Sequence, residues 1–395
     1  MSRSTADREY YRKAAGYIRV ARIAVLVILV VFTVFSMTVH REEITLENLR
    51  YLMRYIDIQS PGTAGGDGRV GFVAGEDAYY RMLGDKLVVF DDKRVSSYDF
   101  TGHKLFSENI SYINPVCTAN DKYLLVYDHY GRGLSVYNSF SKVSEKKLST
   151  DTEYIYLDKN GSFAAITKEK SYSGGFVVYD SNFNKSYSFM SRDMNITDVA
   201  LLSGKHTAVC ATTGAKNGDF YSKVLFFDIS TEQEPREYEL YGQMPLSLFA
   251  SHNTVVLATD GGMYFFDCDG VNTAHVPFGT DTLSGIYRFD DFFAVCLKTA
   301  ETGVDTVVKL YDYKGNTLFT SQHKSEVFNI SYKNGKILIL EHFLLNTLSY
   351  DKGIVSVSET ISVDGEFKKA FATTGGYVLV SSSGAVESKY SSSAE

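Results

Sequence analysis

The sequence predicts an all-β protein, more narrowly a β-propeller, over most of its length. Tyr (29) and Phe (26) are abundant among the 395 residues, and aromatic and β-branched side chains favour strands. No helical period persists after Arg69; instead, a pattern of about forty residues recurs up to Tyr390. With 44% hydrophobic residues, the chain has enough apolar surface for a large core.

Each copy of the pattern contains an apolar run, a polar turn and a second run that ends in an aromatic residue followed by Asp or Asn. These pairs lie 39 to 48 residues apart, at Tyr98-Asp99, Tyr137-Asn138, Tyr179-Asp180, Phe227-Asp228, Phe266-Asp267, Tyr311-Asp312 and Tyr350-Asp351. The eight apolar runs are Leu87–Phe90, Leu124–Tyr127, Phe163–Thr167, Thr207–Ala211, Val255–Ala258, Phe293–Leu297, Ile337–Leu340 and Val378–Val380.

A ring of sheets explains this period. One four-stranded sheet with two apolar faces cannot bury both alone, whereas sheets stacked radially bury each other. Forty to fifty residues suffice for four short strands and their turns. The number of apolar runs favours eight blades over seven. The last unit, residues 367–390, has room for only three strands, so RVGFVAG (69–75) is expected to supply its fourth.

The Asp or Asn of each pair is predicted to fix a turn. Such a side chain accepts hydrogen bonds from the backbone about two residues further on. A residue that is repeated seven times around a ring is expected to be structural, because a catalytic residue would not be copied in this way.

A membrane anchor is predicted at residues 23–39, which read IAVLVILVVFTVFSMTV without a charge, Gly or Pro. Seventeen residues of helix span about 26 Å, near the short end of what crosses a bilayer. The preceding 22 residues carry a net charge of +4, and basic flanks stay cytoplasmic, so the C-terminal bulk is predicted to be extracytoplasmic. A cleaved signal peptide is the alternative, but no clear cleavage site follows the apolar run.

The domain prediction follows from these segments. Residues 1–22 form a basic cytoplasmic tail, 23–39 the transmembrane helix, 40–68 a stalk helix and linker, 69–390 the propeller and 391–395 a disordered tail. The stalk helix is inferred from mixed three- and four-residue apolar spacing in residues 44–58. The linker is the Gly-rich run SPGTAGGDG that follows it.

Charge and cysteine content exclude some classes of function. The net charge is −7, and without the first 22 residues it is −11, so nucleic acid is not expected as a partner. The four cysteines are far apart and sit in or beside apolar runs, which predicts buried free thiols rather than a metal cage. One long-range disulfide remains open. The cysteines are Cys117, Cys210, Cys268 and Cys296.

Two segments, SSYDFTGHKLF (96–106) and KLYDYKGNTLF (309–319), resemble the repeat of quinoprotein-like and WD40-like propellers. With its N-terminal anchor, the whole chain resembles an uncharacterised bacterial family of single-pass, extracytoplasmic propellers. Phe106 and Phe319 stand where quinoprotein repeats usually have Trp, and this sequence has none. The resemblance therefore implies the fold and a binding scaffold, but not a quinone cofactor or its Ca²⁺ site.

No catalytic, cofactor-binding or metal-binding residue is predicted, and no cofactor. The eight histidines lack any metal-binding spacing and are expected in turns or at the surface: His40, His103, His129, His206, His252, His275, His323 and His342. Carboxylates could still meet at the centre of the ring, as a glycosidase or lyase would require. The candidates are Asp151, Glu153, Asp198, Asp290 and Asp291.

The sequence thus favours a non-enzymatic scaffold, held at the membrane through one helix, that binds a protein or an envelope glycan. The alternative is a carbohydrate-active enzyme, which requires three or more inward acidic side chains at one end of the channel. A sensor is a third possibility, but its 22-residue tail is too short for an output domain, so signalling would need a membrane partner.

Overall fold

The computed structural model describes residues 68–91, 93–101, 103–216, 219–231, 233–303, 305–363 and 367–390. By its contacts the chain divides into the units Met1–Gly62 and Thr63–Glu395, and every described residue belongs to the second. The predicted cytoplasmic tail, transmembrane helix, stalk and C-terminal tail lie outside the described residues. Within the described ranges, no helix is long and apolar enough to cross a membrane.

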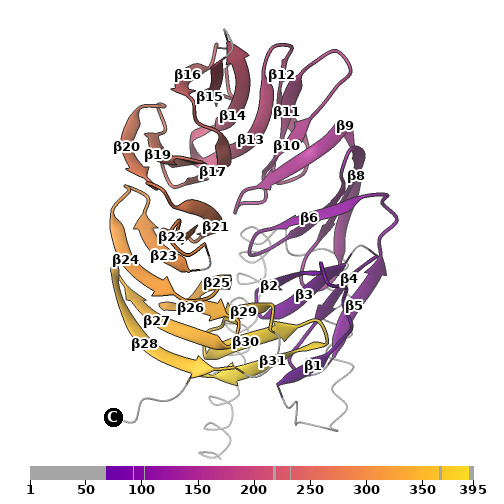
Figure 1. Ribbon diagram of the computed structural model, residues 1–395. Coiled ribbons are helices and arrows are strands. Elements are labelled where there is room, and N and C mark those ends of the chain that lie inside the picture. Colours follow the sequence, from indigo (N-terminus) through magenta and orange to yellow (C-terminus); the bar gives the residue numbers. More distant parts are fainter. Residues whose placement is uncertain are drawn as a thin grey trace, which may run out of the picture. The chain divides into compact units, whose positions relative to one another are not determined.

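The described residues form an all-β unit, as predicted. They contain thirty-one strands and one short 3-10 helix, and the strands form six four-stranded sheets and one seven-stranded sheet. Figure 1 shows the sheets arranged around a ring, with first strands such as β17 and β25 toward the centre and fourth strands such as β24 and β28 at the periphery. Neighbouring strands within each sheet run antiparallel, and all of them except the pair β1 and β31 follow each other in sequence.

The first half of the ring contains four repeat units. The first is β2 (Tyr79–Leu83), β3 (Lys86–Asp91), β4 (Arg94–Tyr98) and β5 (Lys104–Asn109). The second and third share β9 and comprise β6 (Pro115–Ala119), β7 (Leu124–Asp128), β8 (Gly131–Tyr137), β9 (Lys142–Leu157), β10 (Phe163–Thr167), β11 (Gly174–Tyr179) and β12 (Lys185–Ser191). The fourth is β13 (Asn195–Leu202), η1 (Ser203–Lys205), β14 (Thr207–Lys216), β15 (Asp219–Asp228) and β16 (Arg236–Tyr241).

The second half contains the remaining units. The fifth is β17 (Pro245–Ser251), β18 (Thr254–Thr259), β19 (Gly262–Asp267) and β20 (Asn272–Pro277). The sixth is β21 (Thr282–Arg288), β22 (Phe292–Lys298), β23 (Thr306–Asp312) and β24 (Thr317–His323), and the seventh is β25 (Val327–Lys333), β26 (Lys336–Glu341), β27 (Leu344–Asp351) and β28 (Ile354–Ser362). The last is β29 (Lys369–Ala372), β30 (Gly376–Ser381), β31 (Gly384–Lys389) and β1 (Arg69–Gly71).

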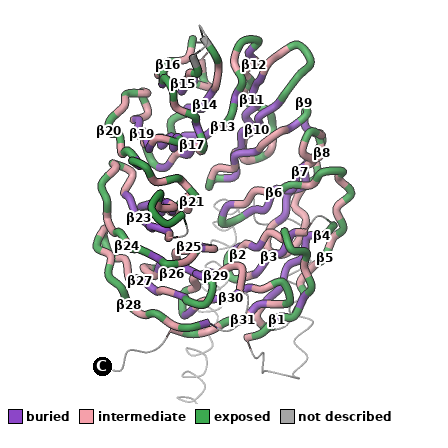
Figure 2. Tube along the Cα trace, in the orientation of Figure 1, coloured by how far each residue is buried: buried purple, intermediate pink, exposed green. Residues whose placement is uncertain are grey.

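All eight predicted apolar runs lie in the second strand of a unit, flanked by strands on both sides. This position explains their composition, since both faces of a middle strand are covered by neighbouring sheets. Leu338, for example, has no exposed surface in β26. Figure 2 shows the same contrast: exposed residues gather in turns and in outer strands such as β28.

Strand β9 joins two units into one sheet. Residues 142–147 pair with β8, whereas residues 152–157 pair with β10. The strand therefore acts as the fourth strand of one unit and, after crossing to the centre of the ring, as the first strand of the next. This continuity is not evident from the sequence.

The chain closes the ring as predicted from residues 69–75. Arg69 pairs with Val386 and Gly71 with Gly384, so β1 completes the sheet of β29, β30 and β31. Val70 and Phe72 are buried against the first unit in a cluster that includes Tyr80 and Leu87. The first and last parts of the described chain are therefore held together by both hydrogen bonds and apolar contact.

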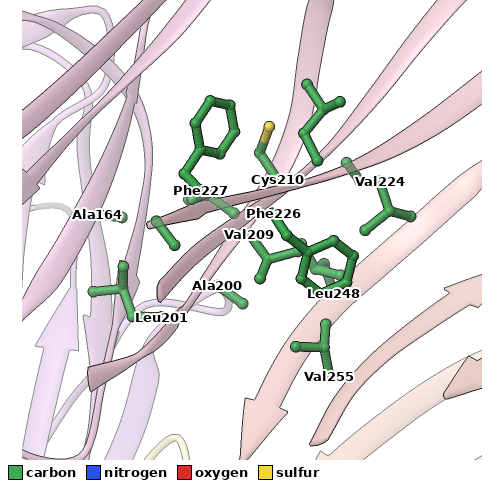
Figure 3. Packing of buried hydrophobic residues seen from close by; sticks show 14 of the residues in the cluster. Ala164, Ala200, Leu201, Val209, Cys210, Val224, Phe226, Phe227, Leu248 and Val255 are labelled. Atoms are coloured by element: carbon green, nitrogen blue, oxygen red, sulfur yellow. The ribbon is translucent and has the colours of Figure 1, made fainter. Parts of the chain in front are cut away.

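Hydrophobic clusters link each unit to the next around the ring. The largest joins the third, fourth and fifth units, and it contains fully buried residues such as Ala164, Val209 and Val255. Figure 3 shows this packing, with Phe226, Phe227 and Cys210 from the fourth unit between strands of its neighbours. Burial between sheets, rather than within one sheet, stabilises the ring.

The predicted role of the repeated Asp or Asn is confirmed at six of the seven pairs. In each, Oδ1 accepts a hydrogen bond of 2.8 to 3.1 Å from the backbone N–H two residues further on; the acceptors are Asp99, Asn138, Asp180, Asp228, Asp267 and Asp312. The seventh differs, because the chain turns through Lys352 and Gly353, both with positive φ, and Asp351 pairs directly with Ile354.

The topology gives the ring two different faces. Turns between second and third strands, and the connections from one unit to the next, lie on one side, which we call the connection face. Turns between first and second strands, and between third and fourth strands, lie on the opposite face. The chain enters β1 from the opposite face, and β31 ends toward the same face, because β1 is a fourth strand and β31 a third strand.

Candidate functional site

The five candidate carboxylates do not gather at one end of the ring. Asp151 and Glu153 lie in β9 where it passes the connection face, whereas Asp290 and Asp291 follow β21 on the opposite face. Asp198 lies between them, within β13. These five residues therefore do not form the single cluster that the alternative glycosidase or lyase requires.

Asp151 and Glu153 do meet in a pocket on the connection face. Its volume is about 340 Å³, and it is lined by Tyr130, Asp151, Glu153, Lys168, Glu169, Lys170 and Tyr172. This volume is at the low end of the range for small-molecule sites. The pocket combines two aromatic rings with side chains of both charges, a composition suited to recognition of a polar surface. We call it the connection-face pocket.

One wall of the connection-face pocket is the turn between β7 and β8. Tyr130 has a positive φ of 63°, an uncommon conformation for a bulky residue, and the residue is 59% exposed. Its N–H donates to the carbonyl of Thr152 at 2.7 Å, which attaches the turn to β9. Gly131 follows it, and a Cβ there would lie 2.3 Å from the Asp128 carboxylate, so a larger residue would displace that side chain. The backbone thus presents Tyr130 to solvent.

The opposite wall is the turn between β10 and β11. The guanidinium of Arg192 lies 5.7 Å from the centre of the Tyr172 ring, a cation–π contact that positions the ring. Across the pocket, Arg132 Nε donates to Asp151 Oδ1 at 2.7 Å. Because Asp151 is engaged in this ion pair, Glu153 and Glu169 are the carboxylates left at the pocket for a partner.

Exposed apolar side chains concentrate on the connection face. Thirteen large hydrophobic residues are exposed in the part of the chain that the structure describes, and three of them, Val271, Ile354 and Val357, lie elsewhere. The ten on the connection face are Val73, Ile113, Val116, Tyr130, Phe220, Tyr241, Met244, Leu246, Phe343 and Leu344. Four of these, Phe220, Tyr241, Met244 and Leu246, sit together where the fourth unit connects to the fifth, and the N–H of Gly242 donates to the carbonyl of Phe220 at 3.1 Å.

Asp198 is bound at the centre of the ring rather than free for catalysis. A bulge between Ile196 and Asp198 shifts the register of β13 at this point. The Asp198 carboxylate accepts N–H groups from Val199 at 2.8 Å and from Leu248 of β17 at 2.7 Å. Burial raises its pKa to about 6, although these hydrogen bonds and the charge of Arg288 act in the other direction.

A buried polar group that the sequence analysis missed lies between the sixth and seventh units. His323 Nδ1 is 2.7 Å from Glu341 Oε1, and His323 Nε2 is 2.7 Å from Ser321 Oγ. Since an ionised carboxylate only accepts, Nδ1 of His323 donates to Glu341. Glu341 also accepts from Ser325 at 2.6 Å and from Asn346 at 2.7 Å. His323 and Glu341 are 7% and 5% exposed.

This order of groups also occurs in serine hydrolases, where the serine faces a substrate pocket. The connection-face pocket is not lined by these residues, and neither is the second pocket of about 300 Å³, which lies between Gly71 and Lys104. The bond from Ser325 instead ties Glu341 to the connection between two units, and the bond from Asn346 ties it to β27 of its own unit. We therefore assign Ser321, His323 and Glu341 a structural role.

The histidines and cysteines fall largely as predicted. Of the seven histidines that the structure describes, His323 contradicts the prediction of turn or surface positions, because it is buried and hydrogen-bonded. The described residues contain no group of three or more His, Cys, Asp or Glu arranged for a metal ion. All four cysteines are free; Cys210 and Cys296 are buried, and Cys117 and Cys268 are half-buried. Burial raises the pKa of the Cys117 and Cys210 thiols, so both are poor nucleophiles.

The closed ring of radial sheets defines the class of protein, a β-propeller. Among solved structures, BamB from Moraxella catarrhalis is similar at 12% identity and a TM-score of 0.50, over 81% of this chain and 98% of that one. Hsv2 of Kluyveromyces lactis matches at 9% identity and a TM-score of 0.45, over 72% of this chain and 98% of its own. At these identities, the similarity to BamB bears on the fold alone.

The chain belongs to the DUF5711 family, described as a family of unknown function, which matches residues 72–387. A search of curated proteins found no match. The matched range covers nearly the whole ring.

Proposed function

We propose that this chain is an eight-bladed propeller, anchored in a cell membrane by residues 23–39, that acts as a non-enzymatic protein-binding scaffold. The blade count rests on eight second strands, with β9 shared between two blades and β1 completing the last. The binding surface is the connection face.

The distribution of exposed apolar side chains is the observation that carries the scaffold proposal. Ten of the thirteen in the described ranges lie on the connection face. Exposed apolar groups with a polar surround are typical of protein–protein contact sites, and scattered single residues would not favour one face. The connection-face pocket, with Tyr130 at its edge and charges of both signs around it, supplies the polar part of such a surface.

The anchor proposal rests on the uncharged run at residues 23–39 and on the basic segment before it. The N-terminus is then cytoplasmic and the propeller extracytoplasmic.

The orientation can be tested by protease treatment of intact spheroplasts that express the full chain with a tag at each end. We expect loss of the C-terminal tag and protection of the N-terminal tag. After the cells are lysed, both tags should be digested, which controls for protease access. A C-terminal tag that survives in intact spheroplasts would contradict the orientation.

The binding face can be tested by photo-crosslinking in cells from single positions of the full chain. A photoreactive residue replaces Met244 (52% exposed) or Phe343 (56%) on the connection face, and Val271 (58%) is the control on the opposite face. We expect a reproducible adduct with another protein from Met244 or Phe343, and none from Val271.

The three positions are nearly equally exposed, so a difference in yield reports the face rather than accessibility. Equal adducts from all three positions, or none from Met244 and Phe343, would remove the support for a scaffold that binds through this face. Adducts limited to copies of the same chain would identify self-association and would also count against a separate partner.

A further inference from the structure

Arg288 is an unusual cation at the centre of the ring. It is the last residue of β21, a first strand, and its guanidinium lies 5.7 Å from the centre of the Tyr156 ring and 5.8 Å from that of Phe249. Tyr156 is 5% exposed and Phe249 has no exposed surface, yet Arg288 itself is exposed to solvent. Strands of three different units, β9, β17 and β21, therefore hold one solvent-accessible guanidinium against two buried rings.

The hydrogen-bond donors of Arg288 are not used by the protein. Within the described residues, its side chain donates to no carboxylate, hydroxyl or backbone carbonyl, although a guanidinium has five N–H donors. Asp198 is the neighbouring carboxylate whose charge acts on Arg288, but its two oxygens accept the N–H groups of Val199 and Leu248. The aromatic contacts thus fix the position of the guanidinium and leave its donors for solvent or a ligand.

Tyrosines surround this position. Tyr154 and Tyr156 of β9, and Tyr313 after β23, lie close enough for their ionisation to be coupled to the charge of Arg288. The Tyr156 hydroxyl bonds to the backbone of Ala250, and the Tyr313 hydroxyl donates to the carbonyl of Phe289 at 2.7 Å. Tyr154 is half-buried, and its hydroxyl has no hydrogen-bond partner among the described residues, so it is a second donor at the site.

We propose that Arg288 is the centre of a binding site for a small oxyanion, a carboxylate or a phosphate, at the axis of the ring. Both groups accept two parallel N–H bonds from one guanidinium, which a hydroxyl or an amide does not. The site lies at the end of β21 nearer the opposite face, so it is separate from the connection face and does not depend on the scaffold proposal.

Binding at this site is expected to depend on pH through Asp198. The charged and titratable groups that face Asp198 are Arg288 of β21 and Tyr154 and Tyr156 of β9. Ionised Asp198 repels an anion bound to Arg288, whereas protonated Asp198 does not. Burial raises the Asp198 pKa to about 6, so anion affinity should fall as pH rises through about 6.

The test is isothermal titration calorimetry of the full chain in detergent at about pH 5 and about pH 8. The probes are inorganic phosphate, glucuronate and, as a neutral analogue, glucose. We expect phosphate and glucuronate to bind, glucuronate to bind more tightly at the lower pH, and glucose not to bind. Arg288→Gln should weaken binding at least about tenfold, and Arg288→Lys should give an intermediate affinity. Arg236→Gln is the control, because Arg236 is half-exposed and pairs with Asp269 at 2.9 Å.

Two further readouts separate a binding role from a brace between Tyr156 and Phe249. Asp198→Asn should remove the pH dependence of glucuronate binding while Arg288 is intact, and circular dichroism melting should show that each variant is folded. Binding of phosphate but not glucuronate, or of glucuronate but not phosphate, would show whether the site takes a phosphate or a carboxylate. If neither probe binds the wild-type chain, or if Arg288→Gln and Arg288→Lys bind as well as wild type, Arg288 is a structural brace and the proposal is wrong.

Discussion

Replacement of Glu341 by Ala should lower the free energy of unfolding by about 3 kcal/mol, because it leaves the donors of buried His323 and of half-buried Ser325 and Asn346 without their common acceptor. The measurement is urea unfolding of the purified full chain followed by tyrosine fluorescence. Glu326→Ala is the matched control. Glu326 is 63% exposed and lies 3.6 Å from Lys298, so its loss should change stability by no more than about 0.5 kcal/mol.

The same variant should change the response to acid. Burial opposes ionisation of Glu341, but hydrogen bonds from His323, Ser325 and Asn346 outweigh it and lower the pKa. A group whose folded pKa is lowered stabilises the fold above its unfolded pKa, about 4.3 for Glu, and loses that contribution as pH falls through the folded value. The stability difference between wild type and Glu341→Ala should therefore be largest near neutral pH and shrink below about pH 4. A constant difference would contradict this assignment.

Replacement of Phe72 by Ala should destabilise the ring by about 3 to 4 kcal/mol. Phe72 follows β1, is 9% exposed, and its ring centre lies 5.3 Å from that of Tyr98 and 6.1 Å from that of Tyr80. It therefore packs the closing strand of the last unit against the first unit. The loss of this side chain weakens the closure, where the two ends of the described chain meet.

Val73→Ala controls for the position in the sequence. Val73 is the next residue but is 83% exposed, so its truncation should change stability by less than about 0.5 kcal/mol. Urea unfolding of both variants in the full chain provides the comparison. Similar stabilities for Phe72→Ala and wild type would show that the ring does not depend on this closure.

Local signals in the sequence were sufficient to predict the repeat. Each second strand is covered on both faces, so it appears in the sequence as an uninterrupted apolar run such as Leu124–Tyr127. Such a run can be recognised without knowing which strands lie beside it. The turn residues were equally readable, because Asp267 and similar residues bond to their own backbone two residues on. The closure by residues 69–75 followed from the count of strands.

Other features depend on partners that are distant in sequence. The continuity of β9 was not predicted, because Ser149 to Asp151 look like a polar connection between two units. Ser321 and His323 lie two residues apart, on one face of β24, but Glu341 belongs to the next unit. The one signal of this buried group in the sequence was Glu341, a charged residue at the end of the apolar run KILILE (336–341). Arg288 of the sixth unit meets Tyr156 of the third unit only because the ring brings their first strands together, which spacing does not reveal.

The short ladder at the closure also determines how the molecule bears mechanical load. The segment before Gly68 continues directly into β1, which is paired over only three residues with β31. Tension applied through that segment acts first on a few hydrogen bonds, such as the 2.7 Å bond from Glu387 N–H to the carbonyl of Gly68. The other strands come under load only after β1 detaches. Pulling from the N-terminal side should therefore open the ring at a low force, with a small first extension before the rest unravels.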